Sequence, residues 1–135
     1  MKLRWTTLMG IALATSLCGW LIGATTGSEP KNEPALVHVV LFDLKDDATA
    51  TAAGDLIRDV HKMLAEIPVV TAVHAGKRAP GDRAVHVKDF DVAISLHLKS
   101  ASDVQAYLDH PLHVRFAEKH GEIIERVRVC DFYDE

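Results

Sequence analysis

The sequence predicts an α+β fold with strands and helices in the order β-α-β-β-α-β. Four β-rich apolar runs are separated by two stretches with helical spacing of their apolar residues. A proline, Pro111, divides the second helical stretch at a histidine-rich corner. With 135 residues, 48% hydrophobic and 25% charged, the chain has the composition of one packed domain, with or without a leader.

The first strand is expected at Ala35–Leu44 (ALVHVVLFDL). This run is almost entirely apolar, which predicts a strand covered on both faces. By alternation, His38 shares a face with Val40 and Phe42. An amphipathic helix follows and ends at Pro68. Its charged residues, expected on the solvated side, are Asp55, Arg58, Asp59, Lys62 and Glu66.

The second and third strands are expected at residues 69–75 and 90–99. The third alternates cleanly, which predicts one packed face and one half-polar face carrying His97. Between them, residues 77–88 (KRAPGDRAVHVK) form a basic loop around a Pro-Gly turn. Either this loop is simply solvated, or its basic side chains bind an anion.

The second helical stretch is predicted to break at Pro111. Proline disfavours helical geometry in the residue before it, so the helix carrying Tyr107 should end near Asp109 or His110. Proline is well tolerated in the first turn of a helix, so a second piece should begin at Pro111. The last strand is expected at residues 124–133.

This order of elements is the split βαβ arrangement of ferredoxin-like folds. A four-stranded antiparallel sheet with helices on one face leaves its other face uncovered. A homodimer in which two such sheets face each other, a dimeric α/β barrel, covers that face. We therefore expect residues 35–135 to form one domain that pairs with a second copy.

Residues 1–27 have the layout of a signal peptide. Lys2 and Arg4 precede an uncharged, mostly apolar run over residues 6–24, and small residues follow. Residues 28–34 form a polar linker. The sequence predicts export to the periplasm or the extracellular space, or, if the segment is not cleaved, a membrane anchor at residues 6–24.

Charge and cysteine content narrow the classes of partner. Of 15 basic and 19 acidic residues, Lys2 and Arg4 lie in the leader, which leaves a net charge of −6. Nucleic acid is not an expected partner, because phosphate binding needs clustered Lys and Arg.

Of the two cysteines, Cys18 lies in the leader, so no disulfide within the mature chain is expected. Cys130 is interpreted as a small buried hydrophobe, or else as a reactive thiol.

Three residues suggest a polar site. Asp131 shares a strand face with valines, and a carboxylate buried there needs a partner. An imidazole N–H is a suitable partner, and two histidines are candidates: His38 on the first strand and His113 at the helix corner. A His–Asp pair prepares a general base, and the phenol of Tyr107 can hydrogen-bond a substrate oxygen. The alternative is a purely structural pair. No metal site is predicted, because His110 and His113 lack a third ligand and Pro111 disrupts their helical spacing.

Three segments resemble the stress-responsive dimeric α/β-barrel (Dabb) family: V-H-V-V-L-F-D-L-K, Y-L-D-H-P-L-H and V-C-D-F-Y, between Val37 and Tyr133. The resemblance implies a ferredoxin-like protomer, a homodimeric barrel and no cofactor. The family includes olivetolic acid cyclase, which performs an aldol condensation. By that resemblance, His113 is a general base, Asp131 its partner, and Tyr107 and His38 are pocket residues.

The match to the cyclase is incomplete, because Val92 stands where that enzyme has another pocket histidine. His38, His110 and Phe42 are the residues expected to contact a ligand. Two classes of function remain open. One is a stress-protective dimer that binds a small apolar or carbonyl-bearing molecule. The other is a cofactor-independent lyase, cyclase or isomerase that uses a His113–Asp131 pair.

Overall fold

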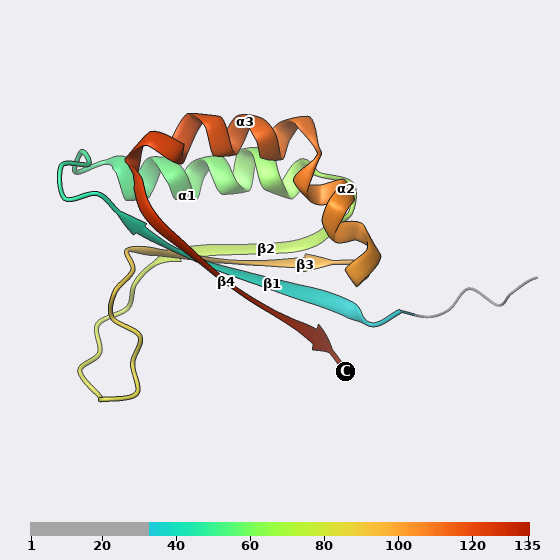
Figure 1. The fold of residues 1–135 in the computed structure, drawn as a ribbon, viewed down its shortest axis with the longest axis horizontal. Helices are drawn as coiled ribbons and strands as arrows, with labels where there is room; N and C mark the ends of the chain where they lie inside the picture. The colour runs from blue at the N-terminus through green and yellow to red at the C-terminus, as the bar shows by residue number, and fades with distance from the viewer. Residues whose placement is uncertain (1–32) are drawn as a thin grey trace, which may run out of the picture. The chain divides into compact units, whose positions relative to one another are not determined.

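The computed structural model describes residues 33–135 and contains the strands and helices in the predicted order (Figure 1). The strands are β1 (Ala35–Leu44), β2 (Val70–Lys77), β3 (Val92–Leu98) and β4 (Ile124–Asp134), and the helices are α1 (Ala52–Met63), α2 (Val104–Leu108) and α3 (Pro111–His120). The leader predicted at residues 1–27 and most of the linker lie outside the described residues. Within residues 33–135, no helix is both long and apolar enough to cross a membrane.

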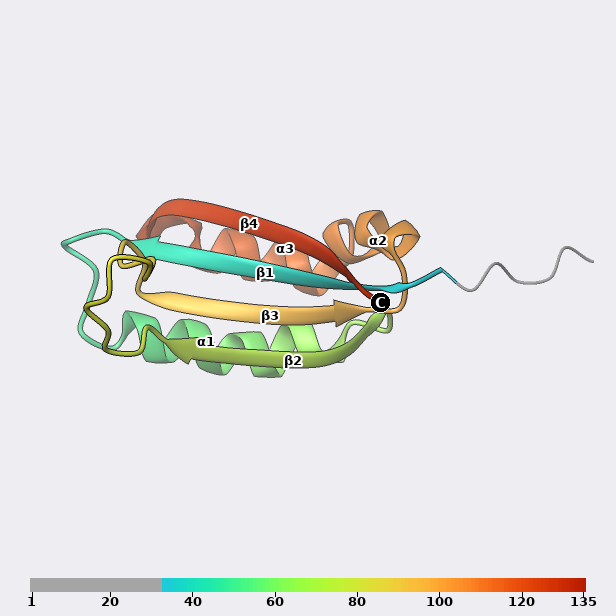
Figure 2. The ribbon, with the colours of Figure 1, turned by 90° about the horizontal axis from the view of Figure 1, so that it is seen from below.

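The four strands form one antiparallel sheet in the order β2-β3-β1-β4. The helices lie on one face of it, as the two ribbon views show (Figures 1 and 2). This confirms the predicted ferredoxin-like fold. β4 is an edge strand paired with β1 in a register that places Asp131 directly opposite His38. That register positions the polar site described below.

The core lies between α1 and the helix-facing side of β3. Leu56, Val60 and Leu64 pack against alternate residues of β3, which are at most 2% exposed. The buried residues of β3 are Val92, Ile94, Leu96 and Leu98. This alternation is the one predicted for the third strand. Truncating any of these leucines to alanine would remove about 2–5 kcal/mol of stability.

Pro111 divides the second helical stretch as predicted. His110 is extended, with φ −67° and ψ 134°, and α3 begins at Pro111. The ring Nδ1 of His110 accepts a hydrogen bond from the backbone N–H of Leu112 at 3.2 Å, so His110 caps α3. The consequence is a fixed corner that holds His113 in the first turn of α3.

Two predicted environments are wrong. Asp59 was expected on the solvated side of its helix but is 5% exposed, because it faces α3. Cys130 was expected to be buried but is exposed. It lies on the sheet face opposite the helices, where Val39 and Leu41 of β1 are also only half-buried. β1 is therefore packed on its helix side and only partly covered on the other.

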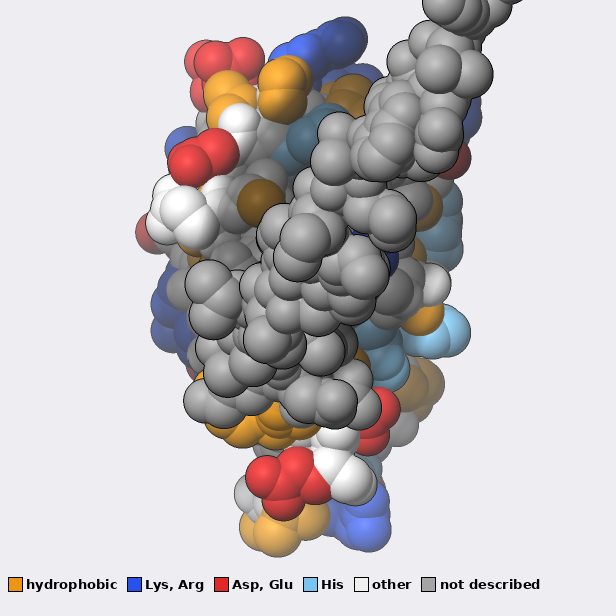
Figure 3. All heavy atoms as spheres, turned by 90° about the vertical axis from the view of Figure 1, so that its right-hand side faces the viewer, with side chains coloured by type: hydrophobic (Ala, Val, Ile, Leu, Met, Phe, Trp, Pro, Cys, Tyr) orange, Lys and Arg blue, Asp and Glu red, His pale blue; other side chains and the backbone are white. Residues whose placement is uncertain are grey.

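Ion pairs fasten the β2–β3 loop to the edge strand. The Arg126 guanidinium donates to Asp43 at 2.8 Å and to Asp89 at 3.0 Å, and Arg128 pairs with Asp89 at 2.9 Å. These arginines hold the pKa of Asp89 below its usual value. On the surface visible in Figure 3, Lys and Arg side chains are interspersed with Asp and Glu.

Candidate functional site

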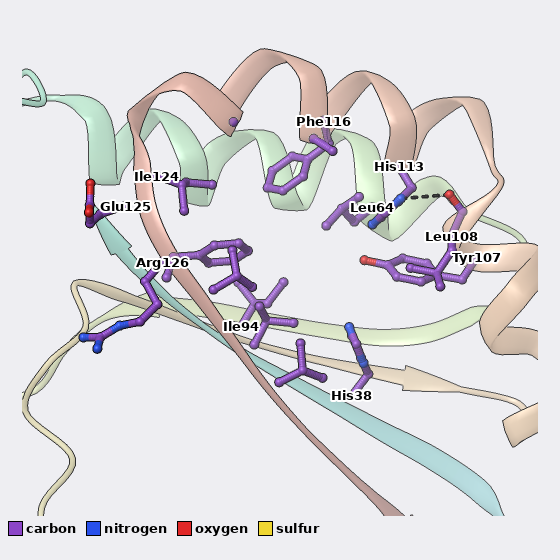
Figure 4. Close-up of a pocket in the computed structure, with 16 residues that line it drawn as sticks. His38, Leu64, Ile94, Tyr107, Leu108, His113, Phe116, Ile124, Glu125 and Arg126 are labelled. Atoms are coloured by element: carbon purple, nitrogen blue, oxygen red, sulfur yellow. Dashed lines mark hydrogen bonds between the residues drawn. The ribbon is translucent and has the colours of Figure 1, made fainter. Parts of the chain in front are cut away.

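A cavity of about 480 Å³ lies between α3 and the β1–β4 side of the sheet (Figure 4). Its walls are mostly apolar, and three polar side chains, His38, Tyr107 and His113, gather at one end. The main apolar residues of the lining are Val40, Phe42, Leu64, Ile94, Phe116 and Ile124. An apolar cavity with a few convergent polar groups is the usual form of a small-molecule site.

His38 enters the cavity from β1 and is held by Asp131 on β4. Nδ1 of His38 lies 2.7 Å from Oδ1 of Asp131, and the two residues are direct cross-strand partners. A carboxylate oxygen accepts, so Nδ1 of His38 donates. The predicted His113–Asp131 contact is therefore wrong. Alternation put both His38 and Asp131 on the helix-facing side of the sheet, and the register of β1 and β4 makes them neighbours.

His113 is held by the backbone instead. Its Nδ1 lies 2.9 Å from the carbonyl oxygen of Leu108, the last residue of α2. In an unbroken helix that carbonyl would accept from the N–H of Leu112. Because Pro111 breaks the helix and Leu112 donates to His110, the carbonyl is free to accept from His113. Burial lowers the pKa of His113. The hydrogen bond to Leu108 opposes this shift, and the electrostatic influence of the nearby His38 ring adds to it.

Tyr107 lies between the two histidines. The ring centroids are 5.7 Å apart for Tyr107 and His38, and 4.6 Å for Tyr107 and His113. Tyr107 is 2% exposed, and this burial raises the pKa of its phenol, so the hydroxyl stays protonated at neutral pH. Figure 4 shows the hydroxyl pointing into the cavity.

The other two residues expected to contact a ligand differ in their placement. Phe42 lines the cavity and packs edge-to-face against Phe116, with ring centroids 6.4 Å apart. His110 caps α3 and is not part of the cavity lining. Its neighbour Pro111 turns the chain between His110 and His113. At this corner, His110 caps α3 and His113 lines the cavity.

A second His–Asp pair joins α1 to α3 outside the cavity, and the sequence analysis missed it. Nε2 of His120 donates to Oδ2 of Asp59 at 2.9 Å, and Lys119 donates to the same oxygen at 2.6 Å. Burial alone would raise the pKa of Asp59. The hydrogen bonds from Lys119 and His120 outweigh burial and hold that pKa below its usual value. The sequence does contain a sign that Asp59 is buried. Asp59 is three residues after Leu56, which places it on the apolar stripe of its helix.

Among residues 33–135, no group of three or more His, Cys, Asp or Glu side chains is arranged to hold a metal ion. The polar end of the cavity is instead equipped for acid–base chemistry and hydrogen bonding. Two imidazoles and a phenol face one another, and each imidazole is oriented by an oxygen acceptor behind it.

Known proteins give the same fold. A stress-response A/B barrel domain-containing protein of Arabidopsis thaliana is 22% identical over 95 residues, which cover 70% of this chain and 82% of the relative. A dimeric ferredoxin-like protein of unknown function from Thermobifida fusca has a TM-score of 0.63 and 22% identity, covering 76% of this chain and 92% of that one. A hydroxynitrile lyase from Passiflora edulis has a TM-score of 0.64 and 19% identity, covering 77% and 95%.

The family profile described as the stress responsive A/B barrel domain (Dabb) matches residues 36–134. This range includes all of the four strands except the first residue of β1, and it also includes the helical corner and both His–Asp pairs. Since the match extends over most of the chain, this protein belongs to the stress-responsive A/B barrel domain family.

Proposed function

We propose that this chain binds a small, mostly apolar molecule in the cavity beside α3. The observation that carries the proposal is the cavity itself, which has a volume of about 480 Å³, a mostly apolar lining, and two imidazoles and a phenol gathered at one end. Its volume lies within the range of about 300–1,000 Å³ common for small-molecule sites. The ligand's apolar part would lie between Phe42, Ile94 and Phe116, with a polar group near Tyr107.

The proposal includes a homodimer. Val127 and Val129 face the cavity but are 49% and 53% exposed, because β4 is an edge strand beyond the reach of α3. Half-exposed valines beside a cavity favour a further covering element. The Thermobifida fusca protein of the same fold is described as dimeric, which favours a second copy in that role. Molecular mass in solution tests this, with a dimer expected.

We also propose that the protein is exported, with residues 1–27 removed or with residues 6–24 retained as an anchor. The positive start and the apolar run support this proposal. Cell fractionation with mass determination of the mature N-terminus tests it. A cytoplasmic protein that keeps its full N-terminus would contradict it.

A screen of neutral apolar compounds by thermal shift tests the binding proposal. Ala117 lines the cavity, whereas Val114 lies on the same helix and does not. Ala117→Phe should abolish the ligand-induced rise in Tm by filling the cavity, and Val114→Phe should preserve it. If no compound raises the Tm of the wild-type protein, or if Ala117→Phe leaves the shift unchanged, the cavity is not the binding site.

A second candidate function is a cofactor-independent enzyme of the lyase or cyclase type. The lowered pKa of His113 favours it, because a neutral imidazole in an apolar cavity can remove a proton from a substrate. The hydroxyl of Tyr107 would hydrogen-bond the developing oxyanion. The His38 imidazole, held by Asp131, would be a second group that can accept or donate a proton. The fold is shared with a hydroxynitrile lyase.

Replacement of His113 by Gln separates the two candidates. The variant retains a polar side chain, so we expect it to fold and to bind ligand. Under the enzyme proposal it should lose turnover, by about 10²–10⁴-fold, the contribution of general acid–base catalysis. His61→Gln is the matched control, because His61 is exposed on α1. Equal turnover in wild type and His113→Gln would leave binding as the function.

A further inference from the structure

Resting on the proposed binding function, we infer that the polar end of the cavity selects a neutral hydroxyl group, such as a phenol, enol or alcohol, and rejects a carboxylate. The inference follows from the protons that the hydrogen bonds assign to three side chains, His38, Tyr107 and His113. Figure 4 shows these side chains converging from β1, α2 and α3.

The proton on His113 is assigned by its partner. A carbonyl oxygen can only accept, so Nδ1 of His113, 2.9 Å from the carbonyl of Leu108, carries a hydrogen. In a neutral imidazole the other nitrogen is then an acceptor. The other ring nitrogen of His113 points into the cavity in Figure 4. His113 therefore offers the ligand a hydrogen-bond acceptor.

The same argument applies to His38. Its Nδ1 donates to Asp131 at 2.7 Å, which leaves Nε2 as the acceptor of the neutral ring. His38 is 8% exposed and lines the cavity. His38 lies on β1 and His113 on α3, and their hydrogen-bond partners differ. In both rings, Nε2 remains available to accept a hydrogen bond from the ligand.

Tyr107 supplies the complementary donor. Among residues 33–135 its hydroxyl has no hydrogen-bond partner, although the residue is only 2% exposed. Because this hydroxyl points into the cavity, it can donate to an acceptor on the ligand. A hydroxyl group meets all of these needs, because its oxygen accepts from Tyr107 while its hydrogen is donated to one of the imidazoles.

A carboxylate fits this end poorly. It has acceptors only, so it would satisfy Tyr107 and leave both imidazole acceptors without a hydrogen. Its charge would also lie near Asp131 and against apolar walls. Among residues 33–135, Arg126 at the opposite end of the cavity does not provide a free cation, because its guanidinium points away from the cavity and is bonded to Asp43 and Asp89.

Three probes that share one apolar body test the inference: 4-butylphenol, butylbenzene and 4-butylbenzoate. Calorimetry at pH 8 keeps the phenol neutral, because phenols ionise near pH 10. We expect 4-butylphenol to bind about tenfold more tightly than butylbenzene, the gain of one to two net hydrogen bonds. We expect 4-butylbenzoate to bind more weakly than butylbenzene.

Tyr107→Phe keeps the buried ring and removes the donor. It should reduce the advantage of 4-butylphenol over butylbenzene several-fold and leave butylbenzene unchanged. Tyr133→Phe is the matched control, because Tyr133 is 52% exposed and outside the cavity lining. A selectivity that both variants reduce equally would overturn the assignment to Tyr107.

The outcomes separate the inference from the function on which it rests. If butylbenzene binds as tightly as the phenol, or if the benzoate binds most tightly, the head-group inference is wrong and the binding site stands. If none of the three binds, or if Ala117→Phe leaves their binding unchanged, both the site and the inference are wrong.

Discussion

The two His–Asp pairs of this domain have the same chemistry and opposite surroundings. His120 and Asp59 are 3% and 5% exposed, and Lys119 also donates to the carboxylate of this α1–α3 pair. In the cavity pair, His38 is 8% exposed, but the side chain of Asp131 is 41% exposed, and Nε2 of His38 is left for a ligand.

The two pairs differ in whether every hydrogen-bonding group of the pair has a partner. We expect this difference to separate a pair that only stabilises the fold from one that also binds a ligand. The α1–α3 pair is surrounded by packed side chains, including Phe116, whose ring centroid is 4.9 Å from that of His120. The cavity pair leaves one nitrogen facing open space. Breaking the first should affect stability, and breaking the second should affect binding.

The largest expected effect comes from Asp59→Ala. Removing one partner of a buried ion pair costs about 3–5 kcal/mol, and we expect the lower end, because the side chain of Lys119 is 56% exposed and can return to water. Urea unfolding measures the loss. Asp55→Ala is the control, because Asp55 is an exposed salt-bridge partner of Arg58 and its loss should change stability much less. Equal losses of stability in the two variants would contradict the assignment of a stabilising role to the buried α1–α3 pair.

Acid should act on the same pair. The pKa of folded Asp59 is lowered below its ordinary 3.8, so the unfolded chain binds the proton first as the pH falls. This stabilisation is fully present well above pH 3.8 and is lost as the pH falls through 3.8 and then through the folded pKa. Asp59→Asn should flatten this part of the stability curve between about pH 5 and 2. An unchanged acid limb would contradict the assignment.

Asp131→Ala should have a smaller effect on stability and a clear effect on binding. The carboxylate is 41% exposed, so its pair contributes at most about 1 kcal/mol to folding. Without it, Nδ1 of His38 is no longer fixed as the donor, and the affinity for 4-butylphenol should fall several-fold. Asp134→Ala, near the end of the same strand, is the control. A large stability loss with unchanged binding would make the cavity pair structural as well.

The smallest expected effect is the pH dependence that His113 contributes. Its folded pKa lies below the ordinary 6.5, so the unfolded state takes up the proton first and stability declines as the pH falls below about 6.5. His113→Gln should remove this slope between the folded pKa and pH 6.5. Phenol affinity should persist at pH 6.5 and fall at lower pH, once His113 is protonated. Stability that rises on acidification in this range would reverse the assigned sign.

The sequence predicted the fold because its signals are local. β1 has the predicted bounds, Ala35–Leu44. α3 begins at Pro111, as predicted, because proline lacks the N–H that an interior helix position needs and a first-turn position does not. The His113–Asp131 contact failed because it depends on cross-strand register, which faces His38 with Asp131. The freed carbonyl of Leu108 then gave His113 a backbone partner, which spacing between motifs does not reveal.

The most direct test of the central claim is a long-range ¹H–¹⁵N spectrum of the histidine rings, recorded at pH 8 with and without 4-butylphenol. We expect His38 and His113 to carry their protons on Nδ1, with a bare Nε2 whose resonance shifts in at least one ring when the phenol binds. Rings that carry the proton on Nε2, or two Nε2 resonances that ignore the phenol while it binds, would contradict the proposed site.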